Sequence, residues 1–212
     1  MTRLALVSFW LLAADAGMSA VQIALDPRAV SEAIAIGQSR LDRERARFHA
    51  PYRLAAKGEP VDYVEVITPF RRVVLAAESR AVTGDRTFGQ RQGIELLGTG
   101  PAVVELVVEM TFHPLNTFVG VPDYAVALVA PGLPPLRPRA IDRIPRHGPR
   151  VDGAPLPDRN VIPPPTDHPL VGGAMVARFD AQLLNEKGIY DVVIEDGGKE
   201  LARVRADLAG MR

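Results

Sequence analysis

The chain is predicted to adopt an α+β fold, mainly β with some α, in which short helices pack on an antiparallel β-sandwich. Apolar and polar residues alternate from Val103 to Phe112 and in three stretches after residue 174, which is the pattern of half-buried strands. Before residue 100, apolar residues instead recur at helical spacing in several places. The hydrophobic content of 47% and the charged content of 24% are those of an ordinary globular protein, so we expect a packed core.

The first twenty residues have the three-part pattern of a secretory signal peptide. A short basic start at 1–3 precedes an apolar run from Leu4 to Ala14, and small residues follow it. Such a run is shorter than the roughly 20 residues that cross a bilayer. We therefore expect a periplasmic or secreted protein, with cleavage after Ala16 or Ala20. An uncleaved anchor and a buried N-terminal element of a cytoplasmic protein are the alternatives.

The composition excludes several classes of function. The chain contains no cysteine, which excludes disulfides, thiolate chemistry and a lipid-modified cysteine. The net charge is zero, whereas nucleic-acid-binding domains are usually basic, so we expect no nucleic-acid partner. No second apolar stretch approaches spanning length, so we expect no membrane span after the signal segment. Arginine far outnumbers lysine, and alanine, proline and glycine are abundant, as in proteins of GC-rich bacteria.

Capping signals place the first expected helix. Asp26 is a good N-cap and Pro27 suits the first helical position, so a helix is predicted over about 27–48, before Pro51. Its apolar stripe is narrow and contains a glycine, so we expect it to lie across a larger body.

Two further helices are predicted before residue 100. Thr68-Pro69 starts one whose apolar residues share a face, and Thr83-Gly84-Asp85 ends it. The alternative is a strand that continues through 73–75 after a proline bulge. A short helix within 87–97 is weakened by its glycines, because glycine has a low helix propensity.

Strands are predicted at 63–67, at 103–112 and at 124–129. Three more alternating segments, at 175–180, 190–195 and 202–208, are expected to form one antiparallel sheet, with a hairpin turn at Asp196-Gly197-Gly198. That sheet would leave an apolar face bare. The strands at 103–129 would cover this face, which predicts an immunoglobulin-like β-sandwich.

The stretch 131–169 holds 12 of the 19 prolines and is predicted to contain no regular helix or sheet. It is either an extended linker or a long loop along the body. The predicted organisation is thus a signal peptide at 1–20, a helix-plus-strand region at 21–130, this Pro/Arg-rich stretch, and a C-terminal segment at 170–212 that completes the same sandwich.

One polar strand face offers a candidate catalytic or metal site. Glu105, Glu109, Thr111 and His113 share this face of the predicted strand at 103–112 or follow it. Residues four apart on a strand are separated by about 13 Å, so a partner strand would have to supply further ligands. A solvated strand face is the alternative interpretation.

A local basic stretch offers a candidate contact with an anionic partner such as lipid phosphate or an acidic protein. Its arginines are interleaved with proline, and no aromatic residue lies among them, which argues against nucleic acid. Intramolecular pairing with carboxylates is the alternative. The stretch comprises Arg137, Arg139, Arg143, Arg146 and Arg150.

The remaining chemistry-bearing residues form no recognised catalytic motif. The four histidines lack metal-ligand spacing, and no serine lies in a nucleophile-elbow context. We therefore predict no cofactor and no metal, and a non-catalytic binding, assembly or structural module of the cell envelope, with an unidentified protein or envelope component as partner. The alternative is a metal- or carboxylate-dependent extracytoplasmic hydrolase that uses Glu105, Glu109 and His113.

Overall fold

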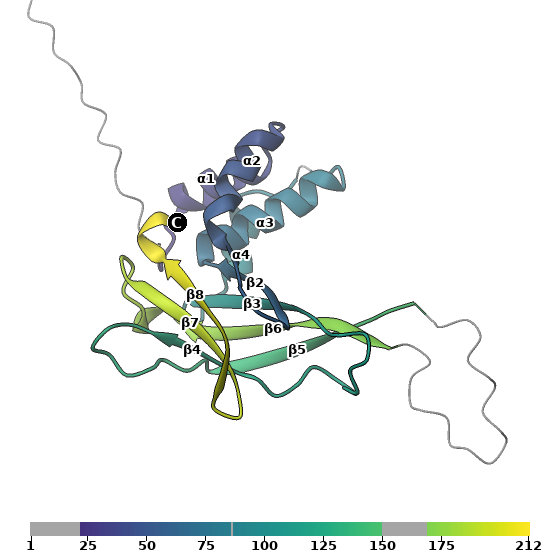
Figure 1. Ribbon diagram of the computed structural model, residues 1–212. Coiled ribbons are helices and arrows are strands. Elements are labelled where there is room, and N and C mark those ends of the chain that lie inside the picture. The colour runs from purple at the N-terminus through teal and green to yellow at the C-terminus, as the bar shows by residue number, and fades with distance from the viewer. Residues whose placement is uncertain (1–21, 86, 150–168) are drawn as a thin grey trace, which may run out of the picture.

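The computed structural model describes residues 22–85, 87–149 and 169–212, and within these ranges the chain forms four α-helices and two antiparallel sheets of five and three strands (Figure 1). The helices gather on one side of the sheets. The predicted α+β class is confirmed, with four helices where one to three were expected. None of the helices in the described ranges has the length and apolarity needed to cross a membrane. The predicted signal peptide at 1–20 lies outside the described residues.

The first predicted helix is wrong as a single element. The chain divides it into α1 (Pro27–Gly37) and α2 (Asp42–His49). The predicted cap is confirmed, because the Asp26 carboxylate accepts a hydrogen bond from the Ala29 N–H at 2.7 Å.

Two local features explain the break between α1 and α2. At Gly37 a Cβ atom would lie only 2.4 Å from the carbonyl oxygen of Val74, so the chain passes very close to a neighbouring helix here. Directly afterwards, the Ser39 hydroxyl oxygen accepts a hydrogen bond from the Leu41 N–H at 3.2 Å. Such local side-chain bonds compete with continuation of a helix.

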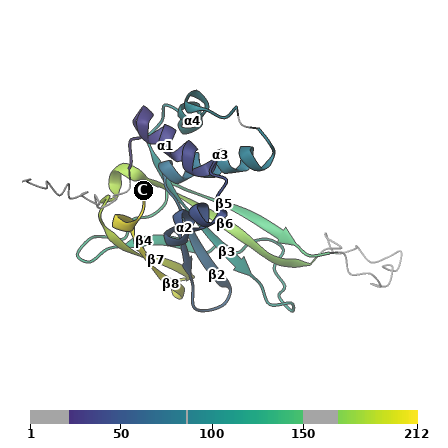
Figure 2. The same ribbon diagram turned by 90° about the horizontal axis from the view of Figure 1, so that it is seen from above.

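The other two helices form as predicted, and the rival strand at 73–75 does not. They are α3 (Pro69–Val82) and α4 (Gln90–Leu97), which lie beside α1 in the view from above (Figure 2). A Cβ atom at Gly93 would lie 2.6 Å from Cγ1 of Val30 in α1. The glycine that weakens α4 as an isolated helix thus permits its close packing on α1.

The larger sheet has the strand order β1-β2-β3-β6-β5 and the smaller one the order β4-β7-β8, with antiparallel pairing throughout. The strands of the larger sheet are β1 (Arg53–Ala55), β2 (Val61–Ile67), β3 (Val103–Thr111), β6 (Leu170–Asp180) and β5 (Ala140–His147). Those of the smaller sheet are β4 (Ala125–Val129), β7 (Ile189–Asp196) and β8 (Lys199–Asp207).

The prediction that the three C-terminal strands share one sheet is wrong. β6 pairs with β3 and β5 in the larger sheet, whereas β7 and β8 form a hairpin in the smaller one. The alternating pattern specifies which face of a strand is buried, but it does not specify the neighbouring strand. The hairpin turn itself is confirmed, with φ values of 55° at Gly197 and 87° at Gly198.

A strand also forms within the Pro-rich stretch, where none was predicted. β5 is an edge strand, and Pro145 lies opposite Gly173 of β6. Edge strands tolerate proline because one of their sides has no ladder partner that needs an N–H donor. Residues 150–168 of the stretch lie outside the described ranges.

One hydrophobic cluster joins side chains of both sheets. It includes Leu106, Met175 and Phe179 from the larger sheet and Val192 and Ile194 from the smaller one, each at most 1% exposed. Because side chains alternate along a strand, the polar residues of β3 point away from this cluster, on the side where α3 begins. The candidate site lies on that side.

Candidate anion-binding pocket

A hollow of about 560 Å³ lies where the first turn of α3, the end of α4 and the start of β3 meet. Three of its lining side chains are polar, namely Arg72, Arg139 and Gln182. Most of its other lining side chains are apolar, among them Ile23, Leu25, Pro69, Ile94, Leu97 and Pro101. We call this hollow the Arg72–Arg139 pocket.

The start of α3 determines where Arg72 lies. The Thr68 hydroxyl caps the helix by accepting a hydrogen bond from the Arg71 N–H at 3.1 Å. Two arginines therefore occupy the first turn, and their side chains diverge. The Arg71 side chain is 2% exposed, whereas that of Arg72 is 26% exposed and lines the pocket.

Glu105 of β3 holds two guanidinium groups on this side of the sheet. Its Oε2 lies 3.2 Å from Nη2 of Arg72, and its Oε1 accepts a hydrogen bond from Nε of Arg178 at 3.1 Å. Arg178 also contacts Asp142 at 2.7 Å, and hydrogen bonds to Asp142 and then Glu105 raise the pKa of the Arg178 side chain. Glu105, a predicted site residue, thus lies between arginines.

The contact between Arg72 and Glu105 is an ion pair without hydrogen-bond geometry. Nη2 of Arg72 is buried and has no hydrogen-bond partner among the described residues, although Oε2 of Glu105 lies within ion-pair distance. The two charges therefore attract each other, while the side-chain donors of Arg72 make no hydrogen bond to a described residue.

Arg139 comes to the same pocket from the segment before β5. Its backbone N–H donates to the Arg178 carbonyl at 2.8 Å, which anchors it beside β6. Its side chain is exposed and makes no hydrogen bond or ion pair with any residue in the described ranges. Two guanidinium groups with unused donors therefore line one hollow, an arrangement suited to a bound anion.

An acidic residue also lies near the pocket. Asp180 follows Arg178 by two positions on β6, and its carboxylate accepts a hydrogen bond from the Gln182 N–H at 3.0 Å. This bond caps the short 3₁₀-helix η2 (Ala181–Leu183). The carboxylate is thus directed toward η2, and its negative charge limits how much added negative charge the pocket can hold.

The other residues of the predicted polar face do not converge with Glu105. Glu109 accepts a hydrogen bond from Arg146 at 3.2 Å, and the Thr111 hydroxyl donates to Asp62 at 2.8 Å. His113 lies in the turn after β3, where its Nδ1 accepts from the Leu115 N–H at 3.2 Å. Within the described residues there is no group of three His, Asp or Glu side chains that could hold a metal ion.

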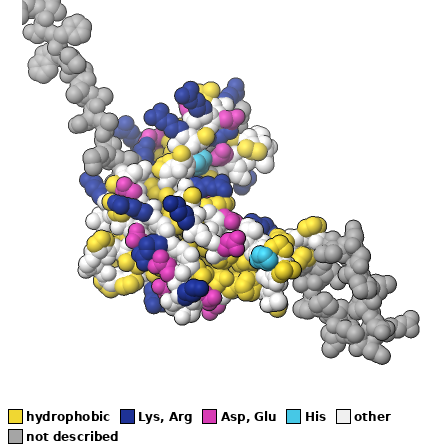
Figure 3. Space-filling view, in the orientation of Figure 1, with side chains coloured by type: hydrophobic (Ala, Val, Ile, Leu, Met, Phe, Trp, Pro, Cys, Tyr) yellow, Lys and Arg dark blue, Asp and Glu magenta, His cyan; other side chains and the backbone are white. Residues whose placement is uncertain are grey.

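The predicted basic stretch is divided among different surroundings. Arg143 pairs with Asp123, and Arg146 bridges Glu109 and the Met110 carbonyl. Arg137 is exposed, and Arg150 lies outside the described residues. Basic and acidic side chains are interspersed over the face shown in Figure 3, in keeping with these internal pairs.

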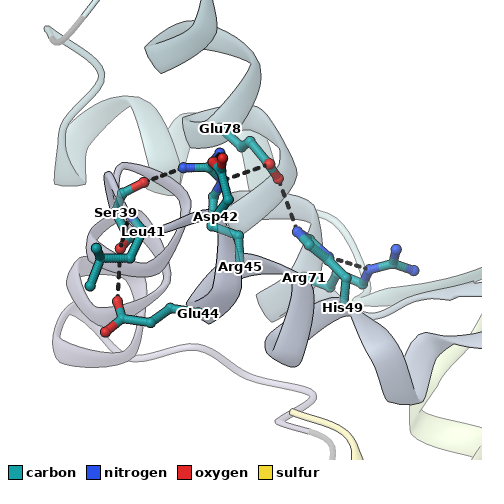
Figure 4. Close-up of polar contacts among 8 residues, drawn as sticks. All are labelled: Ser39, Leu41, Asp42, Glu44, Arg45, His49, Arg71 and Glu78. Atoms are coloured by element: carbon teal, nitrogen blue, oxygen red, sulfur yellow. Dashed lines mark hydrogen bonds and ion pairs between the residues drawn. The ribbon is translucent and has the colours of Figure 1, made fainter.

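Sequence reasoning missed a polar chain that ties the helices to the larger sheet (Figure 4). Glu78 of α3 accepts a hydrogen bond from Nε of Arg45 at 3.0 Å and lies 2.9 Å from Nε2 of His49. Nε of Arg71 lies 3.4 Å from Nδ1 of His49. Because a guanidinium only donates, Nδ1 accepts and Nε2 carries the hydrogen that is donated to Glu78.

The same chain continues into β2. Arg71 donates to the Val66 carbonyl at 2.6 Å and pairs with Glu65. Every charged group of this polar chain has an oppositely charged partner, and none of its side chains is a nucleophile. We therefore assign the polar chain a structural role. Its sequence signal is Arg71, one of two arginines in the first turn of the amphipathic helix α3.

A larger hollow of about 910 Å³ lies between α1, α2 and the C-terminal residues. Its polar groups largely satisfy one another: Glu32 accepts a hydrogen bond from Arg212 at 2.7 Å, and Glu44 accepts from the Ser39 hydroxyl at 2.8 Å. Arg47 also lines it. The smaller Arg72–Arg139 pocket, with two guanidinium groups whose side-chain donors make no hydrogen bond to a described residue, is therefore the stronger candidate.

Comparisons of the chain with protein-family models, with curated proteins and with solved structures find no match.

Proposed function

We propose that the chain is an exported, non-catalytic binding module of a bacterial envelope, and that it binds organic anions in the Arg72–Arg139 pocket. The signal-like pattern of residues 1–20 supports export. The two sheets, which share one hydrophobic cluster, form an antiparallel sandwich of the immunoglobulin-like kind in this proposal.

The observation that carries this proposal is the unused donor capacity of two guanidinium groups in one hollow. A guanidinium has five N–H donors. Neither Arg72 nor Arg139 uses any side-chain donor in a hydrogen bond to a described residue. Arginine binds carboxylates through paired, charge-assisted hydrogen bonds, so a carboxylate is the natural complement.

The pairing of the strand carboxylates favours binding over hydrolysis. Glu105 accepts a hydrogen bond from Arg178, and Glu109 accepts one from Arg146. General acid–base work requires a carboxyl group that can reach the substrate proton, and these groups are already engaged in charge-assisted bonds.

Isothermal titration calorimetry with benzoate tests the binding site, with neutral benzamide as the matched probe. Benzoate should bind at least tenfold more tightly than benzamide, and Arg139→Ala should abolish that preference. Arg137→Ala is the control, because Arg137 is also exposed but does not line the pocket. Equal binding of both probes, or equal loss in both variants, would overturn the proposed site.

Export is tested by N-terminal sequencing of the protein from fractionated cells. We expect a chain that begins after Ala16 or Ala20 in the periplasmic or secreted fraction. A cytoplasmic chain that begins at Met1 would contradict this part of the proposal.

A further inference from the structure

The Arg72–Arg139 pocket leaves a large apolar side chain in contact with solvent. Ile94 lines the pocket from α4 and is 46% exposed. Ile23 and Leu25, which also line the pocket, are only partly buried. Exposed apolar surface inside a concave site is the feature that a ligand with an apolar body would cover.

Few side chains of the pocket are polar, and the rest of its polar surface comes from backbone groups. Apart from Arg72 and Arg139, Gln182 is the only polar side chain among its lining residues in the described ranges. A sugar or a nucleotide would bring several hydroxyl or amide groups that need partners, and burying such groups unpaired costs free energy. The side chains of the lining therefore favour a ligand with one polar end and an apolar remainder.

The acidic neighbours of the pocket limit the charge of that polar end. Oε2 of Glu105 lies 3.2 Å from Nη2 of Arg72, and the Asp180 carboxylate accepts a hydrogen bond from the Gln182 N–H. These two carboxylates offset the charges of Arg72 and Arg139, so the pocket offers little net attraction to a second negative charge on the ligand. A carboxylate carries a single charge and matches the guanidinium fork.

We infer that the pocket binds an amphiphilic monocarboxylate, with its carboxylate between Arg72 and Arg139 and its alkyl chain along Ile94, Ile23 and Leu25. This inference rests on the proposed function and names the ligand class of the same site. The volume of about 560 Å³ lies within the range of small-molecule sites.

Calorimetric titration with hexanoate, octanoate and decanoate, each below its micellar concentration, tests the alkyl chain. Affinity should rise about fourfold for each added methylene until the pocket is filled, as expected for burial of a CH₂ group. Ile94→Ser should flatten this rise, while the preference for benzoate over benzamide should persist. Leu96→Ser is the matched control, because Leu96 is 41% exposed on the same helix but does not line the pocket.

The outcomes separate this inference from the proposed function. If affinity does not depend on the length of the alkyl chain but is still lost in Arg139→Ala, the pocket binds anions and the inferred ligand class is wrong. If Leu96→Ser flattens the rise as much as Ile94→Ser does, the alkyl chain lies elsewhere and the inference fails. Tighter binding of decyl phosphate than of decanoate would overturn the single-charge argument. If no carboxylate binds, both proposals fail.

Discussion

The Tyr52 hydroxyl bonds to both backbone groups of Arg212, a residue 160 positions later in the chain. It accepts from the Arg212 N–H at 2.8 Å and donates to the Arg212 carbonyl at 3.0 Å. The Arg212 side chain extends this contact to the helices, because its guanidinium lies over the Phe70 ring and pairs with Glu32. The last described residue thus fastens the end of the smaller sheet to the helical layer.

Tyr52→Phe should lower the free energy of unfolding by about 1–2 kcal/mol, because it removes hydrogen bonds at a side chain that is 1% exposed. Urea denaturation measures this loss. Tyr63→Phe is the control, because the Tyr63 hydroxyl bonds to no described residue, and its change should stay within about 0.5 kcal/mol. Equal losses of unfolding free energy in the two variants would show that the loss in Tyr52→Phe does not come from the contact with Arg212.

The ion pair of Glu32 with Arg212 predicts a specific pH dependence. The hydrogen bond from Arg212 is the main cause that lowers the pKa of Glu32. A lowered carboxyl pKa stabilises the fold above the ordinary glutamate value, and this stability is lost as pH falls through the folded-state pKa. At neutral pH, Glu32→Gln should therefore cost about 0.2–1 kcal/mol, the range of exposed pairs.

That cost should shrink as the pH falls below about 4.3, the ordinary pKa of glutamate. Chemical denaturation at several pH values measures it. Glu186→Gln is the control, because Glu186 is exposed and pairs with no described residue. If the destabilisation by Glu32→Gln instead grew toward acid pH, its sign would contradict a lowered pKa of Glu32.

Arg71→Met should be severely destabilising, by about 3–5 kcal/mol, because it leaves Glu65 and His49 without their buried partner. Adding Glu65→Gln should recover part of the loss, since it removes the unpaired charge. Thermal and urea unfolding measure both variants. Arg91→Met should change stability by no more than about 0.5 kcal/mol, because the Arg91 side chain is 82% exposed. A similar small change in Arg71→Met would refute the structural role of the polar chain.

Gly93→Ala should destabilise the protein by about 1–3 kcal/mol, although alanine is the better helix former. The added methyl would come within 2.6 Å of Val30 on α1 and force the two helices apart. Equilibrium denaturation measures the loss, with Glu95→Ala on the exposed face of α4 as the control. A stabilising effect would show that helix propensity outweighs the packing of α4 on α1.

Local signals in the sequence were sufficient to predict several individual helices and turns. Thr68-Pro69 and the apolar spacing after it predicted α3, and Asp196-Gly197-Gly198 predicted the hairpin between β7 and β8. These signals succeed because capping and turn chemistry act over a few neighbouring residues. The break at residues 38–41 was missed, because the apolar spacing continues across it while the close approach to Val74 is a tertiary contact.

The candidate pocket could be predicted only in part. Glu105 and Arg139 were both singled out, but in separate hypotheses, as a carboxylate site and as an anion contact. Arg72 was not singled out, because in the sequence it is one polar residue of an amphipathic helix. Only tertiary contacts bring these three together: β3 pairs with β6, Arg139 is anchored to Arg178 of β6, and α3 places Arg72 beside Glu105.

The sequence by itself determined most of the helices and strands, which face of each is apolar, and where the signal-like segment lies. The tertiary structure decided which strands are neighbours, that the C-terminal strands divide between two sheets, and that Arg72 and Arg139 line one hollow. The physical reason is the range of the interactions. Periodicity and capping depend on residues a few positions apart, whereas strand pairing and charge pairing depend on contacts between residues far apart in the chain.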